Sequence, residues 1–85
     1  MTVRIETTSE GSQTVVSVAG RLLAAGATEL RRTCSAIGGE FVLDLSGLRS
    51  ADSEGISIIR ELVREGAKLR AASPFIRLLI AENGD

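Results

Sequence analysis

The order of apolar and polar positions predicts a hairpin at the start of the chain. Residues 3–6 alternate apolar and polar side chains, as in a strand with one face in water, and residues 14–19 form a second, β-branched run. The turn-forming residues 9–12 between them favour an antiparallel connection. We therefore expect two paired strands, the second ending at Gly20.

From Ala27 the apolar period becomes that of a helix, which the glycine pair 38–39 is expected to end. Its inward positions are Ala27, Leu30, Cys34 and Ile37. The nearly continuous apolar run 41–45 predicts a central strand. A loop over 46–52 and a second amphipathic helix, closed by Gly66, should follow. The inward positions of that helix are Ile56, Ile59, Leu62 and Val63.

The last third of the chain predicts a short strand over 68–72 and a final helix. Ser73 is expected to cap that helix and Pro74 to occupy its first position. The order is thus β-β-α-β-α-β-α, an α/β fold. Right-handed crossovers between parallel strands place the first two helices on one face. We expect a four-stranded mixed sheet with the hairpin at one edge and the helices packed on it.

Length and composition indicate one small globular domain over residues 1–85, with a modest core. The net charge of −1 and the lack of Tyr and Trp do not favour nucleic-acid binding. The single cysteine, Cys34, fits a reducing compartment and is expected to be buried. No signal peptide and no apolar run of about 18 residues is evident, so we expect a cytoplasmic location without membrane insertion.

The residues that most enzymes need are missing. The chain has no histidine, which removes Ser-His-Asp and Cys-His catalysis, and it has no P-loop motif. Asp44, Asp52 and Glu54 lie near one predicted strand end, where carboxylates hold magnesium in other proteins. Strand alternation would send Asp44 to the other face, however. We expect no metal, no cofactor and no enzymatic activity.

The segment SADSEGIS, residues 50–57, follows the carboxyl end of a parallel strand, where functional groups gather in such sheets. Asp52 is the predicted N-cap of the second helix. Gly55 would let a partner or the neighbouring strand approach closely. Arg49 is placed to pair with Asp52 or Glu54, or to lie in water.

Residues 41–56, FVLDLSGLRSADSEGI, resemble a STAS domain, the fold of bacterial anti-sigma-factor antagonists. The similarity lies in an apolar strand ending in Asp-Leu-Ser, a short loop, and Asp-Ser-(Ser/Thr)-Gly-(Leu/Ile) at a helix start. It extends to the strand and GRL over residues 16–22 and to residues 65–80, and so covers most of the chain after about Thr14. The resemblance implies a small module that binds a protein partner, either a kinase-like anti-sigma factor or another signalling protein.

The chain departs from the family pattern at Glu54, which occupies the position phosphorylated in regulatory members. The phosphorylation switch therefore cannot operate at this residue. Either the carboxylate stands in for a phosphate, with less charge and fewer oxygens, or it simply favours the helix start. Ser53 is an alternative phosphoacceptor, although beside a capping aspartate it is expected to satisfy the loop backbone instead.

A second departure lies after the Ser-Pro helix. Family members typically continue into another strand and helix, which this sequence is expected to lack. The strand at 68–72 would then be a free edge, although Lys68 and Arg70 discourage edge pairing. Homodimerisation through that edge, or through the apolar face of the last helix, is a hypothesis.

Three functions remain open. The first is a non-catalytic module that binds a signalling partner through the surface at 50–59. Its predicted contact residues are Asp52, Ser53, Glu54, Gly55, Ile56 and Ile59. The second, implied by the resemblance, is an accessory STAS subunit that clamps the ATPase subunit of a lipid-transporting ABC system. The third, a module for a small metabolite, has little support because no polar pocket is evident.

Overall fold

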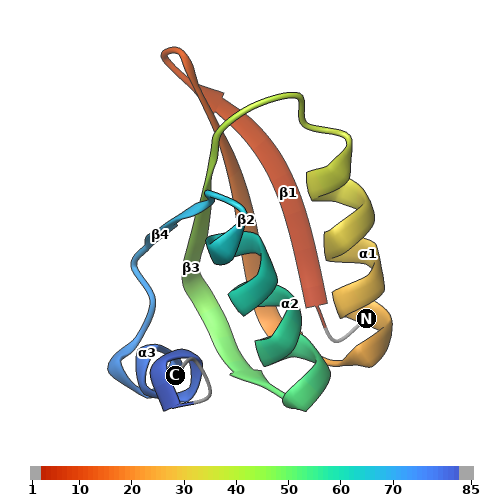
Figure 1. Cartoon of the computed structure of the whole chain (residues 1–85), viewed down its shortest axis with the longest axis vertical. Helices are drawn as coiled ribbons and strands as arrows, with labels where there is room; N and C mark the ends of the chain where they lie inside the picture. Colours follow the sequence, from red (N-terminus) through yellow and green to blue (C-terminus); the bar gives the residue numbers. More distant parts are fainter. Residues whose placement is uncertain (1–2, 83–85) are drawn as a thin grey trace.

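A computed structural model describes residues 3–82 of the chain (Figure 1). The strands are β1 (Val3–Glu10), β2 (Gln13–Leu22), β3 (Phe41–Ala51) and β4 (Lys68–Arg70), and the helices are α1 (Ala24–Ser35), α2 (Ser53–Arg64) and α3 (Pro74–Glu82). This order confirms the predicted β-β-α-β-α-β-α arrangement. None of these helices is both long and apolar enough to cross a membrane.

The strands form one mixed sheet in the order β1-β2-β3-β4. β1 and β2 are antiparallel and meet at a tight turn, where Gly11 has a φ of 63°. That left-handed conformation suits glycine, which has no Cβ to clash. β3 is parallel to both β2 and β4. The predicted mixed sheet with a hairpin at one edge is therefore confirmed.

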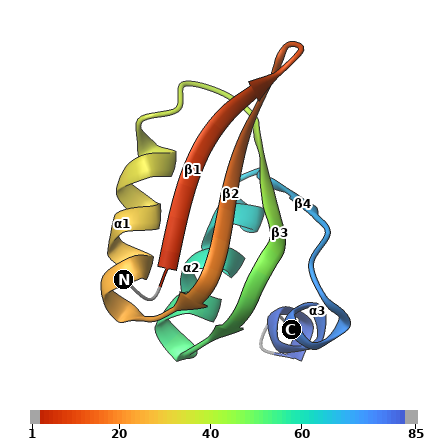
Figure 2. The same ribbon diagram turned by 180° about the vertical axis from the view of Figure 1, so that it is seen from behind.

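The helices α1 and α2 lie side by side on one face of the sheet, as predicted (Figure 1). Between helices and sheet lies one cluster of buried side chains, to which Leu30 of α1, Leu43 of β3 and Ile59 of α2 all contribute. The helix α3 adds Ile76 to the same cluster. Seen from behind, the opposite face of the sheet carries no helical layer in the described part of the chain (Figure 2).

Three strands are longer than predicted, and one of them is β1, which extends past residue 6 to Glu10. β2 continues through Gly20 to Leu22, and β3 continues through the segment 46–51 that was predicted to be a loop. The extensions of β2 and β3 pair with each other, with register irregularities before Ala19 and after Gly20. Gly47 permits this pairing, because a Cβ there would lie 2.8 Å from the Cβ of Ala19. The connection between β3 and α2 shrinks to a single residue.

Helix boundaries also shift. α1 begins at Ala24, three residues before its predicted start, and ends at Ser35, before the glycine pair. Cys34 is buried as expected, and burial raises its thiol pKa to about 11. β4 ends at Arg70 rather than residue 72, because Ala71 turns the chain with a φ of 61°.

The start of α3 follows the prediction. Its first residue is Pro74, and the hydroxyl oxygen of Ser73 accepts a hydrogen bond from the backbone N–H of Ile76 at 3.2 Å. The helix packs against α2 with Ile76 fully buried. Proline at the first position forfeits no helical hydrogen bond, since the first N–H groups lack partners in any case.

A charged network crosses the open face of the sheet. Arg70 of β4 donates to Asp44 of β3 at 2.8 and 3.1 Å, and to both carboxylate oxygens of Glu10, from β1, at 3.0 and 3.2 Å. The backbone N–H of Ser46 donates to the other oxygen of Asp44 at 2.9 Å. The Ser46 N–H and the Arg70 guanidinium hold the pKa of Asp44 below its ordinary value, and Arg70 lowers the pKa of Glu10. The network therefore ties three of the four strands together.

Candidate functional site

Asp52 caps α2 as predicted. Its side-chain Oδ1 accepts a hydrogen bond from the backbone N–H of Gly55 at 2.8 Å, and its carbonyl accepts from the N–H of Ile56 at 2.9 Å. The first four N–H groups of a helix lack partners within the helix, and the cap satisfies one of them. The helix therefore begins at Ser53 with a defined orientation.

Gly55 provides close approach to the neighbouring strand rather than to a partner. A Cβ at this position would collide with the carbonyl oxygen of Leu22, the last residue of β2, and would lie 3.1 Å from the Cβ of Ala51. The same Leu22 oxygen accepts a hydrogen bond from the N–H of Asp52 at 3.1 Å. The first turn of α2 thus rests directly on the end of β2.

The six predicted contact residues divide into two groups. Ser53 and Glu54 are exposed and Asp52 is half-buried, whereas Gly55 and Ile56 are buried. Ile59 is 0% exposed and belongs to the core. A molecule approaching from solvent therefore reaches only the first three, and the buried three support them from beneath. Ser57, one helical turn beyond Ser53 and Glu54, adds an exposed hydroxyl that the sequence prediction does not include.

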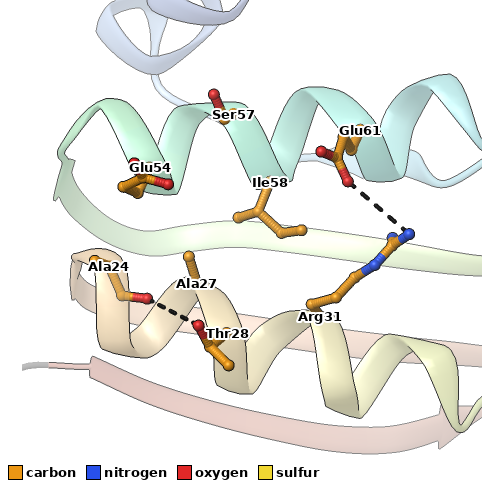
Figure 3. Close-up of a pocket in the computed structure, with 8 residues that line it drawn as sticks. All are labelled: Ala24, Ala27, Thr28, Arg31, Glu54, Ser57, Ile58 and Glu61. Atoms are coloured by element: carbon orange, nitrogen blue, oxygen red, sulfur yellow. Dashed lines mark hydrogen bonds and ion pairs between the residues drawn. The ribbon is translucent and has the colours of Figure 1, made fainter.

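A groove separates α1 from α2 and begins at Glu54 (Figure 3). Its α2 side carries Glu54, Ser57, Ile58 and Glu61, and its α1 side carries Ala24, Ala27, Thr28 and Arg31. The spacing on each helix is three or four residues, which places the side chains on one face. In the middle of the groove Ile58 and Ala27 point toward each other (Figure 3). The helical spacing in the sequence predicts each face but not their pairing.

One end of this groove is closed by ion pairs. Arg31 of α1 binds both carboxylate oxygens of Glu65, just past α2, at 3.0 and 2.9 Å, and lies 3.9 Å from Glu61. Arg31 holds the pKa of Glu65 below its ordinary value through this hydrogen bonding and charge. A bidentate arginine–carboxylate pair fixes geometry as well as charge, so it joins α1 to the far end of α2.

Glu54 lies at the other end of the groove. Its carboxylate forms no hydrogen bond or ion pair with any of residues 3–82. Arg49 pairs with neither Asp52 nor Glu54 in the described chain. Of the two expectations for Arg49, the one that remains is that its side chain lies in water. The Ser53 hydroxyl likewise makes no bond to the loop backbone there, so the expectation that it satisfies that backbone is wrong. The Asp52 carboxylate serves the first turn instead.

A second hollow lies on the α3 side of α2. Leu79 of α3 lines it together with Asp52, Ser53 and Ser57. On the helix, Leu79 lies between the buried Ile76 and the exposed side chains of Phe75 and Leu78, which are 57% and 61% exposed. An apolar surface therefore continues outward from the side of the candidate site.

The three carboxylates considered for a metal do not converge. Asp44 points to the open face and binds Arg70, while Asp52 caps α2 and Glu54 faces the groove. Within residues 3–82, no group of three or more metal-ligating side chains is suitably placed.

Comparison with solved structures identifies the fold. The chain superposes on the crystal structure of an antisigma-factor antagonist, a STAS domain from Rhodobacter sphaeroides, with a TM-score of 0.57. The two share 18% sequence identity, and the match covers 85% of this chain and 92% of the other. The architecture is therefore that of a STAS domain.

Comparison with protein families identifies the lineage. The family model described as "Mlab, STAS domain" matches residues 5–82. The chain belongs to the STAS domain family. No curated protein sequence gives a significant match.

Proposed function

We propose that this chain is a non-catalytic interaction module of the anti-sigma-factor-antagonist type, working in the cytoplasm. It docks a kinase-like anti-sigma factor or another signalling partner through the start of α2. The direct contacts are Asp52, Ser53 and Glu54, extended by Ser57, while Gly55, Ile56 and Ile59 set the position of that surface from below. Family membership supports the proposal, since STAS domains in general are interaction modules without catalytic activity.

The observation that carries the proposal is the exposed carboxylate of Glu54, which has no ion-pair partner among residues 3–82 and stands on a helix start held against β2. A surface that is already ordered loses little conformational entropy when a partner binds. Because glutamate replaces the phosphoacceptor of regulatory family members, the charge is permanent and no kinase is needed to create it. The negative charge of Glu54 also interacts favourably with the dipole of α2, which stabilises the helix by about 0.3–1 kcal/mol. This stabilising role and the docking role are compatible.

The role of Glu54 in docking is separable from its role in the helix. We expect Glu54→Ser and Glu54→Gln to change partner affinity in the same direction, since both remove the charge. Calorimetric titration of the two variants against the partner measures this effect. Unchanged affinity in both variants, accompanied only by a small drop in melting temperature, would reduce Glu54 to a helix-start residue.

Ser53 remains the alternative phosphoacceptor, and its exposed hydroxyl at the first position of α2 is consistent with that role. A phosphate there would meet the free N–H groups of the first turn, but it would also lie beside the Asp52 and Glu54 carboxylates. Intact-mass analysis of the protein isolated from its native cells decides between a modified and an unmodified chain.

Photo-crosslinking tests the docking surface directly. A photo-reactive amino acid replaces Ser53 in the native host, and a matched variant carries it in place of Thr8, which is exposed on β1. We expect a defined protein to be captured through position 53 and not through position 8. Equal capture at both positions, or capture through position 8 alone, would place the interface elsewhere and overturn the proposal.

An accessory role in a lipid-transporting ABC system is the second candidate. Glu54 favours it, because a subunit that clamps an ATPase needs no phosphorylation switch at that position. The same crosslinking experiment separates the two functions, since the protein captured through position 53 would then be an ATPase subunit. This role fails if no ATPase subunit co-purifies from membranes with the tagged chain.

A further inference from the structure

We propose that the groove between α1 and α2 seats a basic side chain of the docking partner, preferentially an arginine, with its charged group at Glu54. This inference rests on the proposed function, because it names the chemistry of the partner at the same surface. Nothing in the docking proposal itself requires it, since a partner could engage Ser53 and Ser57 while leaving the groove empty.

The groove has the form that a long, flexible side chain needs. Its floor consists of small or aliphatic side chains, with Ala27 and Ile58 buried against each other and Ala24 beside them (Figure 3). The methylene stem of arginine or lysine packs readily on apolar surface while its charged end stays near water. The only hydroxyl on the α1 side, that of Thr28, donates to the carbonyl of Ala24 at 3.4 Å within its own helix.

The charge of the groove selects a cation. Arg31 is engaged with Glu65 at 2.9 and 3.0 Å and lies 3.9 Å from Glu61, so one base faces two acids at the closed end. At the open end the Glu54 carboxylate makes no ion pair with the described residues. Among the described residues, three acids and one base therefore line or border the groove, which leaves an excess of two negative charges.

The same end of the groove argues against an anionic occupant. α1 and α2 both begin there, because each follows the carboxyl end of one of two parallel strands. Helix starts attract anions, yet Glu54 already places a carboxylate at this point. A second anion would be repelled, and a purely apolar side chain would cover the carboxylate without compensating it. Arginine is preferred over lysine because its planar group binds a carboxylate through two hydrogen bonds.

The assignment is tested with a defined probe, the peptide acetyl-Gly-Arg-Gly-amide, titrated into isotopically labelled protein and followed by NMR. A matched peptide carries citrulline, which keeps the shape of arginine but not its charge. We expect saturable shifts confined to residues 24–31 and 54–61, and weaker binding of the citrulline peptide by roughly two- to fivefold. The substitution Glu54→Gln should weaken binding of the arginine peptide to the same degree. The control is Glu40→Gln, since Glu40 is an exposed residue of the α1–β3 connection, and this substitution should leave binding of the arginine peptide unchanged.

The outcomes separate this inference from the proposed function. If the partner captured through position 53 binds wild type and Glu54→Gln equally, and the peptide shifts do not depend on Glu54, the groove assignment is wrong while the docking surface stands. If the peptide seats in the groove but no partner is captured through position 53, the docking proposal fails and the groove no longer has a partner to seat, although its preference for a guanidinium group stands. With a captured partner, we expect Glu54→Gln to weaken affinity by about tenfold.

Discussion

The backbone N–H of Asp52 donates a hydrogen bond to the carbonyl oxygen of Leu22 at 3.1 Å. Residues thirty positions apart thus join the end of β2 to the start of α2. The contact places the exposed part of the candidate site, Ser53 and Glu54, on a point where two elements of the core meet. Movement of the helix start would disturb the sheet beneath it, so the sheet restrains the position of the site.

Gly55 should be indispensable for this junction. In Gly55→Ala the new Cβ collides with the Leu22 carbonyl, which is backbone and cannot rotate away. We expect a loss of about 1–3 kcal/mol in the free energy of unfolding, measured with urea. Gly39→Ala is the matched control, because a Cβ there meets nothing within 4 Å. Equal stability of the two variants would contradict the close packing of α2 on β2.

The Asp52 cap should contribute measurably to stability. Asp52→Ala removes the acceptor for the Gly55 N–H, and we expect it to cost about 1 kcal/mol in urea unfolding. Asp52→Asn keeps a side-chain oxygen at the same place and should retain most of that amount. Ser53→Ala serves as the control, since its hydroxyl bonds to nothing in residues 3–82. A larger loss for Ser53→Ala than for Asp52→Ala would refute the cap.

Local signals account for the part of this structure that the sequence predicts well. The order of elements, the cap at Asp52 and the Ser73-Pro74 start all depend on neighbouring residues and were predicted correctly. The extension of β3 through 46–51 depends on pairing with β2, which no local pattern encodes. The small side chains at Ala19 and Gly47 are the only hint of it.

The candidate site likewise has a part that local sequence predicts and a part that depends on contacts between distant residues. Its position at the start of α2 follows from the motif, but the groove requires α1, which lies far away in sequence. Its closing pair, Arg31 with Glu65, joins residues 34 positions apart. Charged residues occur on the outer faces of many helices without forming ion pairs. The pair between Arg31 and Glu65 can therefore be identified only when the packing of α1 against α2 is known. The burial of Ile59 was predicted, yet it was also predicted to contact a partner, and one side chain cannot easily do both.

Acid should weaken the fold through the network on the open sheet face. The Ser46 N–H and Arg70 lower the pKa of Asp44, and Arg70 lowers that of Glu10. A carboxyl group with a lower pKa in the folded state stabilises the fold above its unfolded pKa, and that stability is lost as pH falls through the folded pKa. We therefore expect the free energy of unfolding to decrease progressively below about pH 5.

The same network supplies the control for the acid effect. Arg70→Gln removes the shared cation, so the dependence of stability on pH should become flatter in this variant. Arg49→Gln, which removes an exposed arginine that forms no ion pair with residues 3–82, should keep the wild-type dependence. Identical pH profiles for all three proteins in urea unfolding would show that the network has no energetic role.

The exposed apolar side chains of α3 should promote self-association. Phe75 and Leu78 lie one turn apart and are more than half exposed, and burying such side chains against a second copy removes apolar surface from water. We expect dimers at high micromolar concentration in sedimentation velocity. The double variant Phe75→Ser, Leu78→Ser should be monomeric, and Ala81→Ser should behave as wild type. A monomeric wild-type chain under these conditions would rule out the homodimer.

The ion pair between Glu10 and Arg70 has a consequence for the order in which the chain folds. Its partners are 60 residues apart and belong to the two outermost strands of the sheet. Because their contact requires the intervening strands to be aligned, we expect the bond to close late in folding. Contacts that form after the rate-limiting step slow unfolding and leave the folding rate almost untouched. We therefore expect this ion pair to slow the unfolding of the finished domain without speeding its folding.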